Sequence, residues 1–342
     1  SRARLQGQVI AVTGSVGKTS TKEALLHVFS AQGQTHASPA SFNNHWGVPL
    51  SLARCPASAR FAVFEIGMNH AGEIRGLAQL AEPEIGVVTN VGYAHIENFS
   101  SIDGIAAAKR ELIDALPLSG AAVLNADDAR VLAFRDHFAG RVLTYGTSEQ
   151  ASVRAENITL QPGHVEFSVQ GTRFRSPLAG RHGVSNILAA IAVAQLFDIE
   201  PGQLVEAVAG LVPGKMRGER SKWNDITILD DSYNANPEAV RSMIDALREE
   251  PSQRRIAVLG EMLELGHWAE ALHRDVGKYV AKAGIPVLVG IRGASRFVVD
   301  AAIEAGVPNH AAYFFNEPEQ AGEFLRQYVK PGDAILFKGS RG

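Results

Sequence analysis

The chain has 342 residues and a formal net charge of -3, and 46% of its residues are hydrophobic while 20% are charged. This composition is typical of a globular protein of about two domains with a substantial core, and it excludes the broad basic surface of a nucleic-acid-binding protein. Its one cysteine, Cys55, excludes an internal disulfide. Because neither a signal peptide nor a long apolar run is recognisable, we expect a cytoplasmic protein without a membrane partner.

The first predicted element is a short buried strand over Val9–Val12, followed by a glycine loop and a helix. Gly14 and Gly17 allow backbone N–H groups of such a loop to point at an anion, and the N-terminus of a helix favours negative charge. Lys18 is expected to reach the terminal phosphates of a nucleotide. The Thr19 hydroxyl is expected to bind a magnesium ion.

This stretch matches only a shortened P-loop pattern, TGSVGKT, because the full pattern requires a glycine where the chain has Val12. An incidental glycine turn with an adjacent Lys-Thr pair is the alternative. We favour phosphate binding because a strand precedes the loop and a helix follows it. The residues predicted to bind the phosphates are Gly14, Ser15, Val16, Gly17, Lys18, Thr19 and Ser20.

After the first helix, the polar stretch Ser38–Pro49 is predicted to be a loop that carries hydrogen-bonding side chains. Two buried strands follow, over Phe61–Ile66 and Ile85–Thr89. Because ligands bind outside the carboxyl ends of strands in open α/β sheets, Glu65 is placed to reach a magnesium ion at the first loop. His95 follows the second strand and is expected on the same rim.

A helix is predicted over Ser101–Leu116, and Lys109 within it is interpreted from its position alone as a solvated surface lysine. A further strand, Ala121–Leu124, ends in a polar turn that starts at Asn125. Repeated units of strand, polar turn and helix predict an α/β fold with a mainly parallel sheet and helices on both faces.

Period-two alternation over Ser152–Leu178 predicts antiparallel strands of an appended hairpin sheet. The apolar helix Gly180–Phe197 begins with polar residues, including Asn186, that are placed to touch a ligand. Pro, Gly and a cluster of cations over Val212–Trp223 indicate a domain boundary, where Arg217 is a candidate to face a phosphate.

A second α/β unit follows this boundary, and it is predicted to form a smaller Rossmann-like domain. We therefore divide the chain into domains over residues 1–212 and 213–342. The strands predicted in the second domain are Ile226–Asp231, Arg255–Gly260, Val287–Gly290, Ala312–Phe315 and Ala334–Lys338. Its predicted helices begin at Pro237 and Pro318.

Motifs spread over nearly the whole chain together resemble the Mur ligase family, whose members form amide bonds in peptidoglycan synthesis. In chain order they are TGSVGKTS, FNNHWGVPL, FEIGMNHAGEI, TNVGYAHIE, AAAKREL, NADD, GRHGVSN, DDSYNANPEA, LGEMLELG and FKGSRG. TGSVGKTS is similar to the variant P-loop of that family, which accounts for the missing glycine at Val12. NNHWGVPL, EIGMN, DDSYNANP and GEMLELG are most similar to the members that add D-alanyl-D-alanine.

The resemblance implies that ATP phosphorylates the terminal carboxylate of a UDP-N-acetylmuramoyl-tripeptide. The amine of D-alanyl-D-alanine then attacks the acyl phosphate, and phosphate leaves. An acyl phosphate is needed because a carboxylate is a poor electrophile, and phosphoryl transfer depends mainly on positioning and charge neutralisation. The implied partners are these small molecules, and we expect the chain to act as a monomer.

The resemblance also implies roles for individual residues. The implied catalytic residues are Lys18, Glu65, His95, Lys109 and Arg217. The implied magnesium ligands are Thr19, Glu65, His95 and Lys109, the last as a carbamate, which would reverse its interpretation as a surface lysine because carbamylation turns a cation into an anion. On the nucleotide, Asn125 and Asn186 would face the adenine and Asp231 the ribose. The implied substrate-binding residues are Asn43, Asn44, Tyr233, Asn234 and Asn236.

Two departures from the family pattern are expected to matter. The chain begins close to the P-loop, without the N-terminal domain that grips the UDP-sugar in this family, and it stops directly after KGSRG. The alternatives that stay open are another ligase of the superfamily, such as the folylpolyglutamate type, and a non-catalytic nucleotide-binding scaffold. A P-loop kinase or GTPase is disfavoured by the incomplete loop pattern and by the second α/β domain.

Overall fold

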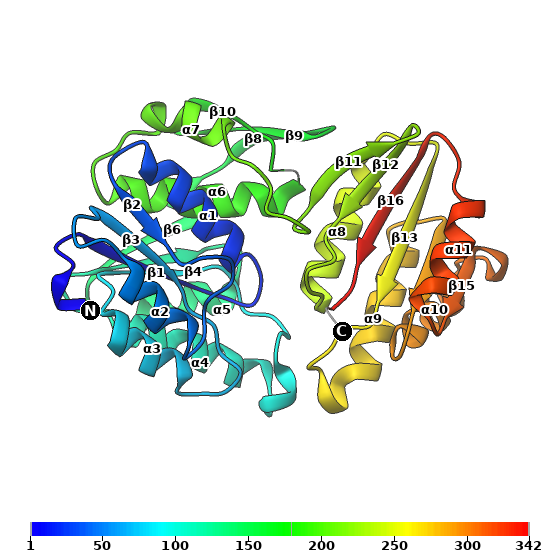
Figure 1. Cartoon of the computed structure of the whole chain (residues 1–342), viewed down its shortest axis with the longest axis horizontal. Helices are drawn as coiled ribbons and strands as arrows, with labels where there is room; N and C mark the ends of the chain where they lie inside the picture. The colour runs from blue at the N-terminus through cyan, green and yellow to red at the C-terminus, as the bar shows by residue number, and fades with distance from the viewer. Residues whose placement is uncertain (1, 179, 341–342) are drawn as a thin grey trace.

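The computed structural model describes residues 2–178 and 180–340. The last two residues of the FKGSRG motif, 341 and 342, lie outside the described part, as do residues 1 and 179. Two halves lie side by side in Figure 1, each built on its own main sheet. We call the part from β1 to α7 the N-terminal half and the part from β11 to β16 the C-terminal half. The predicted α/β fold class is confirmed.

The N-terminal half is built on a parallel sheet with the strand order β2-β3-β1-β4-β5-β6-β7. Its strands are β1 (Gln8–Thr13), β2 (Thr35–Ala37), β3 (Phe61–Glu65), β4 (Ile85–Val88), β5 (Ala121–Asn125), β6 (Arg141–Gly146) and β7 (Val153–Arg154). The strands that follow β1 first extend the sheet on one side of β1 and then on the other. Such a change of direction leaves a crevice at the carboxyl end of β1, where open α/β sheets bind ligands.

Helices cover both faces of this sheet, as predicted for a parallel sheet. They are α1 (Lys18–Ser30), α2 (Gly47–Arg54), α3 (Glu73–Ala81), α4 (Ile102–Asp114), α5 (Ala129–Leu132), α6 (Gly180–Gln195) and α7 (Val205–Ala209). Successive residues of β1 point to opposite faces. Ile10 and Val12 belong to the buried cluster of α1 and α6, whereas Val9 and Ala11 belong to that of α2, α3 and α4.

The segment Ser152–Leu178, predicted to form antiparallel hairpin strands, divides between two sheets. β8 (Glu156–Gln161), β9 (His164–Val169) and β10 (Thr172–Ser176) form the predicted antiparallel sheet. The prediction was wrong for β7, which pairs in parallel with β6 in the main sheet. Because β7 is only two residues long, alternation could not assign it, and burial of Val153 against the α6 side of the core places it.

The stretch Ser38–Pro49, predicted to be a loop throughout, ends in a helix. α2 begins at Gly47, and the Asn44 side-chain oxygen accepts hydrogen bonds from the N–H groups of Trp46 (3.1 Å) and Gly47 (2.9 Å). Asparagine and proline are common in loops, but they also occur where helices start. The prediction was therefore wrong for the last residues of this stretch.

The C-terminal half contains a sheet with the strand order β11-β12-β16-β13-β14-β15. Its strands are β11 (Glu219–Trp223), β12 (Ile226–Asp230), β13 (Arg254–Gly260), β14 (Val287–Ile291), β15 (Ala312–Phe315) and β16 (Asp333–Lys338). All neighbours pair in parallel except β11, which is antiparallel to β12. The sequence did not predict β11, which lies inside the stretch interpreted as a domain boundary.

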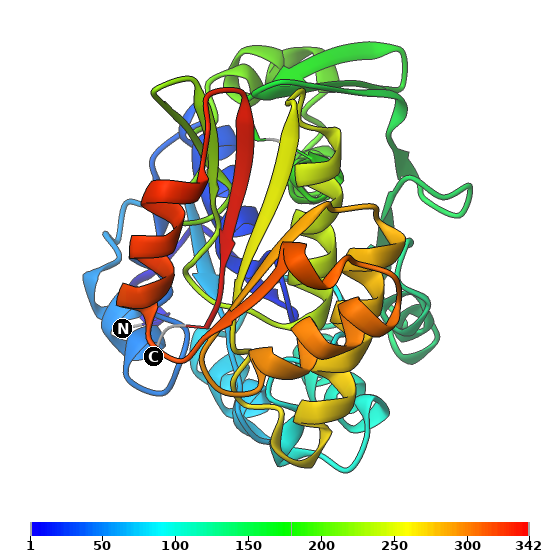
Figure 2. The same cartoon turned by 90° about the vertical axis from the view of Figure 1, so that its right-hand side faces the viewer.

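The helices of this half are α8 (Pro237–Glu249), α9 (Ala269–Lys282), α10 (Ser295–Glu304) and α11 (Pro318–Tyr328). Buried residues of α8, α9 and α10 cluster with one face of the sheet, and those of α11 with the other. Figure 2 shows this half from its outer side, with α11 and β16 in red. No helix within residues 2–178 and 180–340 is long and apolar enough to cross a membrane.

Candidate active site

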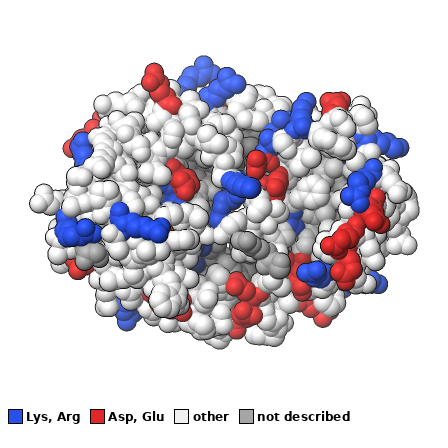
Figure 3. Space-filling model, viewed as in Figure 1, with Lys and Arg blue, Asp and Glu red and all other residues white. Residues whose placement is uncertain are grey.

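A cavity of about 1010 Å³ lies between the two halves, where the carboxyl ends of both sheets meet. Lys18, Glu65 and His95 line it from the N-terminal half, and Asp231 and Lys338 line it from the C-terminal half. Figure 3 shows a hollow between the halves with side chains of both charges at its margin. A smaller cavity of about 400 Å³ shares several lining residues with the first and extends along the linker of residues 211–218.

The glycine loop after β1 adopts a conformation that two of its glycines require. Gly17 has φ of 84°, in the left-handed region, and it directly precedes α1. A Cβ atom on Gly17 would lie 2.7 Å from Oδ1 of Asn186, and one on Gly14 would lie 1.8 Å from Oγ1 of Thr89. The loop is therefore packed so closely against its neighbours that only glycine fits at both positions.

Asn90 holds this loop from the end of β4. Its Oδ1 accepts a hydrogen bond from the Val16 N–H (2.8 Å), and its Nδ2 donates to the Val16 carbonyl (3.1 Å). The Ser15 hydroxyl also donates to the Gly92 carbonyl (3.0 Å). Asn90 directly follows the predicted strand Ile85–Thr89, but the sequence did not identify it as a residue that orders the P-loop.

Lys18 lies at the centre of the site, with its Nζ donating to the Gly14 carbonyl (2.7 Å). Burial lowers the pKa of Lys18, while the Glu65 carboxylate raises it and the Arg217 guanidinium lowers it further. Arg217 lines both cavities. Two cations that face one cavity repel each other, so an anion bound between them would be stabilised.

Thr19 and Glu65 meet beside the P-loop and provide the oxygen atoms that a magnesium ion prefers. The Thr19 hydroxyl donates to Oε2 of Glu65 (2.8 Å), and Nδ2 of Asn43 donates to Oε1 (2.7 Å). Glu65 is only 1% exposed, so these hydrogen bonds hold a buried carboxylate in place. This pair of oxygen donors next to a phosphate-binding loop fits a magnesium ion.

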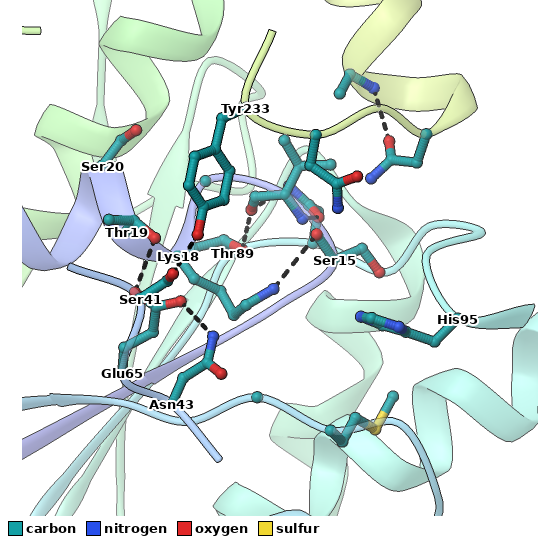
Figure 4. A pocket seen from close by; sticks show the side chains of 18 of the residues that line it. Ser15, Lys18, Thr19, Ser20, Ser41, Asn43, Glu65, Thr89, His95 and Tyr233 are labelled. Carbon is teal, nitrogen blue, oxygen red and sulfur yellow. Dashed lines mark hydrogen bonds between the residues drawn. The ribbon is translucent and has the colours of Figure 1, made fainter. Parts of the chain in front are cut away.

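His95 lies apart from this pair, on the other side of Lys18 in the view of Figure 4. Its Nδ1 lies 2.7 Å from Oε2 of Glu264, a residue of the C-terminal half. The adjacent His95 ring lowers the pKa of the Glu264 carboxyl. Within the described ranges, no three His, Cys, Asp or Glu side chains are grouped as a metal site. The pair of His95 and Glu264 is a contact between the two halves.

Lys109 is buried, with 2% of its surface exposed, so its interpretation as a solvated surface residue was wrong. It lies on α4, whose buried face packs on the sheet. Burial lowers the pKa of Lys109 well below its usual range, and the nearby Lys18 cation lowers it further. Both effects favour the neutral, nucleophilic form of the amine over the charged one.

Most of the predicted residues line the large cavity, but Gly14, Lys109 and Asn125 do not. Ser15, Val16, Gly17, Ser20, Asn43, Asn44, Asn186, Asp231, Tyr233, Asn234 and Asn236 line it, whereas Asn125 is not among the lining residues. The Asn125 side chain instead donates to the Thr89 carbonyl (2.7 Å) and accepts from the Asp127 N–H (2.9 Å). Lys109 also lies behind the lining.

Several lining residues also have local structural contacts. Oδ1 of Asn236 accepts from the Ala239 N–H (2.9 Å) as the N-cap of α8. Asp231 receives a hydrogen bond of 2.5 Å from Nζ of Lys338, which also donates to the Asn234 carbonyl (2.7 Å). These contacts fix the loop that follows β12, which presents Tyr233 to the cavity.

Ser41 was not singled out from the sequence, yet it contacts the other half. Its hydroxyl forms a hydrogen bond with the Tyr233 hydroxyl (Figure 4). The Tyr233 ring in turn lies 3.9 Å from Cζ of Arg217, in a cation–π arrangement. No local pattern signals such a contact, because its two hydroxyls are 192 positions apart in the chain.

The chain is similar in sequence to known ligases. It is 37% identical to the UDP-N-acetylmuramoyl-tripeptide–D-alanyl-D-alanine ligase of Synechocystis, over 99% of this chain and 73% of that protein. It is 32% identical to the ligase of the same name from Bacillus subtilis, over 98% of this chain and 73% of that protein.

Solved structures with this fold are similar over almost the whole chain. MurF from Acinetobacter baumannii has a TM-score of 0.90 at 28% identity, over 99% of this chain and 74% of that one. MurF ligase from Thermotoga maritima in complex with ADP has a TM-score of 0.87 at 26% identity, over 99% and 78%. Folylpolyglutamate synthase from Mycobacterium tuberculosis, at 16% identity and a TM-score of 0.70, shares the fold alone.

Two family descriptions together match most of the chain. Residues 12–194 match the Mur ligase middle domain, and residues 216–341 match the Mur ligase, glutamate ligase domain. These matches include the P-loop, the Thr19–Glu65 pair and the loop that carries Tyr233. The chain belongs to the Mur ligase family.

Proposed function

We propose that the chain is an ATP-dependent ligase of peptidoglycan synthesis that adds D-alanyl-D-alanine to a UDP-N-acetylmuramoyl-tripeptide. The named activity of the Synechocystis and Bacillus subtilis relatives supports this substrate pair. The observation that carries the proposal is the P-loop with Lys18 and the Thr19–Glu65 pair, which opens on a large cavity between the halves. ATP and UDP-linked substrates both fit a cytoplasmic enzyme. Because one chain supplies both sides of the cavity, the enzyme is proposed to act as a monomer.

The reaction proceeds through an acyl phosphate. A carboxylate oxygen of the tripeptide attacks the γ-phosphorus of ATP, and the bond from that phosphorus to the β–γ bridging oxygen breaks, which releases ADP. The amine of D-alanyl-D-alanine then attacks the acyl carbon, loses a proton and displaces inorganic phosphate. The protein contributes mainly by positioning the reactants and by neutralising charge on the phosphoryl group.

Lys18 and Arg217 provide the positive charge for the first step. Their shared position at the cavity supports an anion between them, and the N-terminus of α1 favours a phosphate there. Of the residues proposed for the rest of the nucleotide, Asn186 lies beside Gly17 at the cavity, and Asp231 lies across it. Asn125 has no such support, because its amide is used within the sheet edge.

A magnesium ion is proposed at Thr19 and Glu65, where it would neutralise charge on the phosphate oxygens. The hydroxyl and the carboxylate are already adjacent, and Asn43 orients the carboxylate. For a second ion, His95 and a carbamylated Lys109 remain proposed contributors. The Nδ1 atom of His95 lies against Glu264, which leaves Nε2 as its free ring nitrogen for a ligand.

Carbamylation of Lys109 is supported by its burial and by its lowered pKa. The neutral amine nitrogen attacks the carbon of carbon dioxide, a C–N bond forms, and a proton leaves to water. The product is an anion beside the Lys18 cation. The attraction between this anion and the Lys18 cation favours the modified form over the amine.

Phosphate release by the full-length protein, measured with a panel of acceptors and amines, tests the proposed function. We expect turnover that requires both UDP-N-acetylmuramoyl-tripeptide and D-alanyl-D-alanine. Turnover with free amino acids but not with D-alanyl-D-alanine would instead identify another ligase of the superfamily. ATP binding without turnover on any acceptor in the panel would favour the nucleotide-binding scaffold.

A further inference from the structure

The side chain of Arg217, in the linker, packs on one aromatic ring, that of Tyr233 in the C-terminal half. The Tyr233 ring lies 3.9 Å from Cζ of Arg217, which is the shortest arginine–aromatic distance found in the described part of the chain. The backbones are joined as well, because the Tyr233 N–H donates to the Met216 carbonyl (3.3 Å). A long arginine side chain at the mouth of a cavity would otherwise sample many rotamers.

The Tyr233 hydroxyl is held from the N-terminal half by Ser41. The loop that carries Ser41 is itself fixed, because the buried Lys22 donates from Nζ to the carbonyls of Ser38 (2.7 Å) and Ala40. Lys22 belongs to α1, the helix that begins at the P-loop. A continuous set of contacts therefore joins the phosphate-binding helix to the ring on which Arg217 lies. Figure 4 shows the link between Ser41 and Tyr233.

We propose that Tyr233 is a positioning residue that directs Arg217 to the terminal phosphate, and that its hydroxyl bond to Ser41 makes this placement depend on contact between the two halves. The inference rests on the proposed function, because the terminal phosphate is taken to lie between Lys18 and Arg217. It assigns Tyr233 a different role from the substrate-binding role that the family resemblance implied. When the halves separate, Ser41 releases Tyr233 and Arg217 loses its support.

Nucleotide affinity tests the inference without any acceptor substrate. Calorimetric titration of the full-length protein with ADP and with the β,γ-imido analogue of ATP measures the preference for a terminal phosphate. We expect Tyr233→Leu to reduce this preference by about tenfold, because the cation–π support is lost, and to leave ADP affinity within about twofold. In turnover, the same variant should lower kcat more than it raises KM for ATP.

Two milder variants examine the hydroxyl pair and remain informative if Tyr233→Leu fails to fold. Tyr233→Phe keeps the ring and Ser41→Ala keeps the loop, yet each removes the same hydrogen bond. Each should reduce the preference by about threefold, and the double variant should be no worse than either single one. Tyr328→Leu is the matched control, since Tyr328 also supports an arginine, Arg254, but lies on α11 outside the cavity.

The inference would be overturned if Tyr233→Leu kept the wild-type preference for the ATP analogue over ADP. If Tyr233→Leu fails to fold, the same preference in Tyr233→Phe and Ser41→Ala would overturn it. An equal loss of ADP affinity would overturn it too, because the ring would then contact the nucleotide directly. Additive effects in the double variant would show that Tyr233 and Ser41 do not act through a shared hydrogen bond. A wild type that shows the preference but has no D-alanyl-D-alanine ligase activity would contradict the proposed function and leave the role of Tyr233 standing. A wild type that binds neither nucleotide would contradict both.

Discussion

Lys18 is the residue on which the phosphate site depends most directly. Its Nζ already interacts with the glycine loop, and no other lysine within the described residues lines the cavity from the N-terminal half. We expect Lys18→Ala to reduce acyl-phosphate formation by about a hundredfold or more, because the charge on the transferring phosphate loses its nearest cation. Lys278→Ala on α9 is the control, since Lys278 is exposed. Equal turnover in the two variants would contradict the role of Lys18.

The lowered pKa of Lys109 predicts how its modification depends on pH. Between the lowered value and the usual lysine range, Lys109 is a neutral amine while exposed lysines are still protonated. Carbamylation should therefore persist to a lower pH than on an exposed lysine and decline as the pH falls through the lowered pKa. Carbon-13 NMR of protein equilibrated with labelled bicarbonate measures this. A carbamate signal that is unchanged in Lys109→Arg would show that another amine is modified.

At the residue scale, the sequence predicted which side chains belong to the site better than it predicted which residues they contact. Lys18, Thr19 and Glu65 could be identified because a loop pattern and a strand end specify where such side chains lie. Asn236 was expected to bind substrate, although its side chain caps α8, because capping and ligand binding use the same oxygen. Ser41 carried no signal, since its partner Tyr233 is distant in the chain.

At the scale of elements, the turn from β1 into α1 gives a test of the P-loop conformation. Gly17 and Gly72 have nearly the same backbone conformation, with φ of 84° and 88°. A Cβ atom added to Gly17 would lie within 3 Å of Oδ1 of Asn186, whereas one added to Gly72 would have no neighbour that close. Both alanine variants should lose about 1–2 kcal/mol of stability through left-handed strain. Only Gly17→Ala should also weaken ADP binding by disturbing the loop and Asn186.

Urea unfolding and ADP titration of both variants check this expectation. Gly72 begins the turn into α3 and has open space around it, so it reports the backbone cost alone. If Gly72→Ala weakened ADP binding as much as Gly17→Ala, loss of affinity would reflect general destabilisation. If neither variant changed it, the close packing of the loop would be irrelevant to phosphate binding.

Which elements could be predicted depended on their length and burial. Strands β1, β3 and β13 have runs of buried apolar residues, so their pattern was unambiguous. The strands that were missed or misassigned are short or polar: β7 has two residues, and β11, with the sequence ERSKW, lies at a sheet edge with mostly exposed side chains. Pairing with a neighbour, rather than local preference, makes such segments strands.

On the scale of the whole molecule, the cavity exists because two separately built sheets present their carboxyl ends to each other. Few polar contacts are needed to define that arrangement. Ser41 with Tyr233 and His95 with Glu264 join the halves at the cavity, and Tyr93 with Glu238 joins them beside it. None of these pairs could be predicted from local sequence, because each depends on how the halves meet.

The contact of Glu238 predicts that the arrangement of the halves depends on pH. Glu238 lies in the first turn of α8 and accepts a hydrogen bond from the Tyr93 N–H (3.2 Å) across the interface. Partial burial raises the pKa of Glu238, and the Asp128 carboxylate raises it further. The hydrogen bond from Tyr93 and the Arg241 cation lower this pKa, but the net shift is upward. The closed arrangement therefore binds a proton more tightly than an open one, in which water reaches the carboxylate. Closure is favoured below the raised pKa and is weakened as the pH rises through it.

Small-angle scattering of the full-length protein over a series of pH values, from acidic to mildly basic, measures this effect. We expect the radius of gyration to increase with pH in the wild type and to increase less in Glu238→Gln, which is always neutral and still accepts from Tyr93. Glu319→Gln is a matched control, because Glu319 also follows a helix-initiating proline but is exposed on α11. If Glu238→Gln expanded with pH as the wild type does, another group would control the contact between the halves.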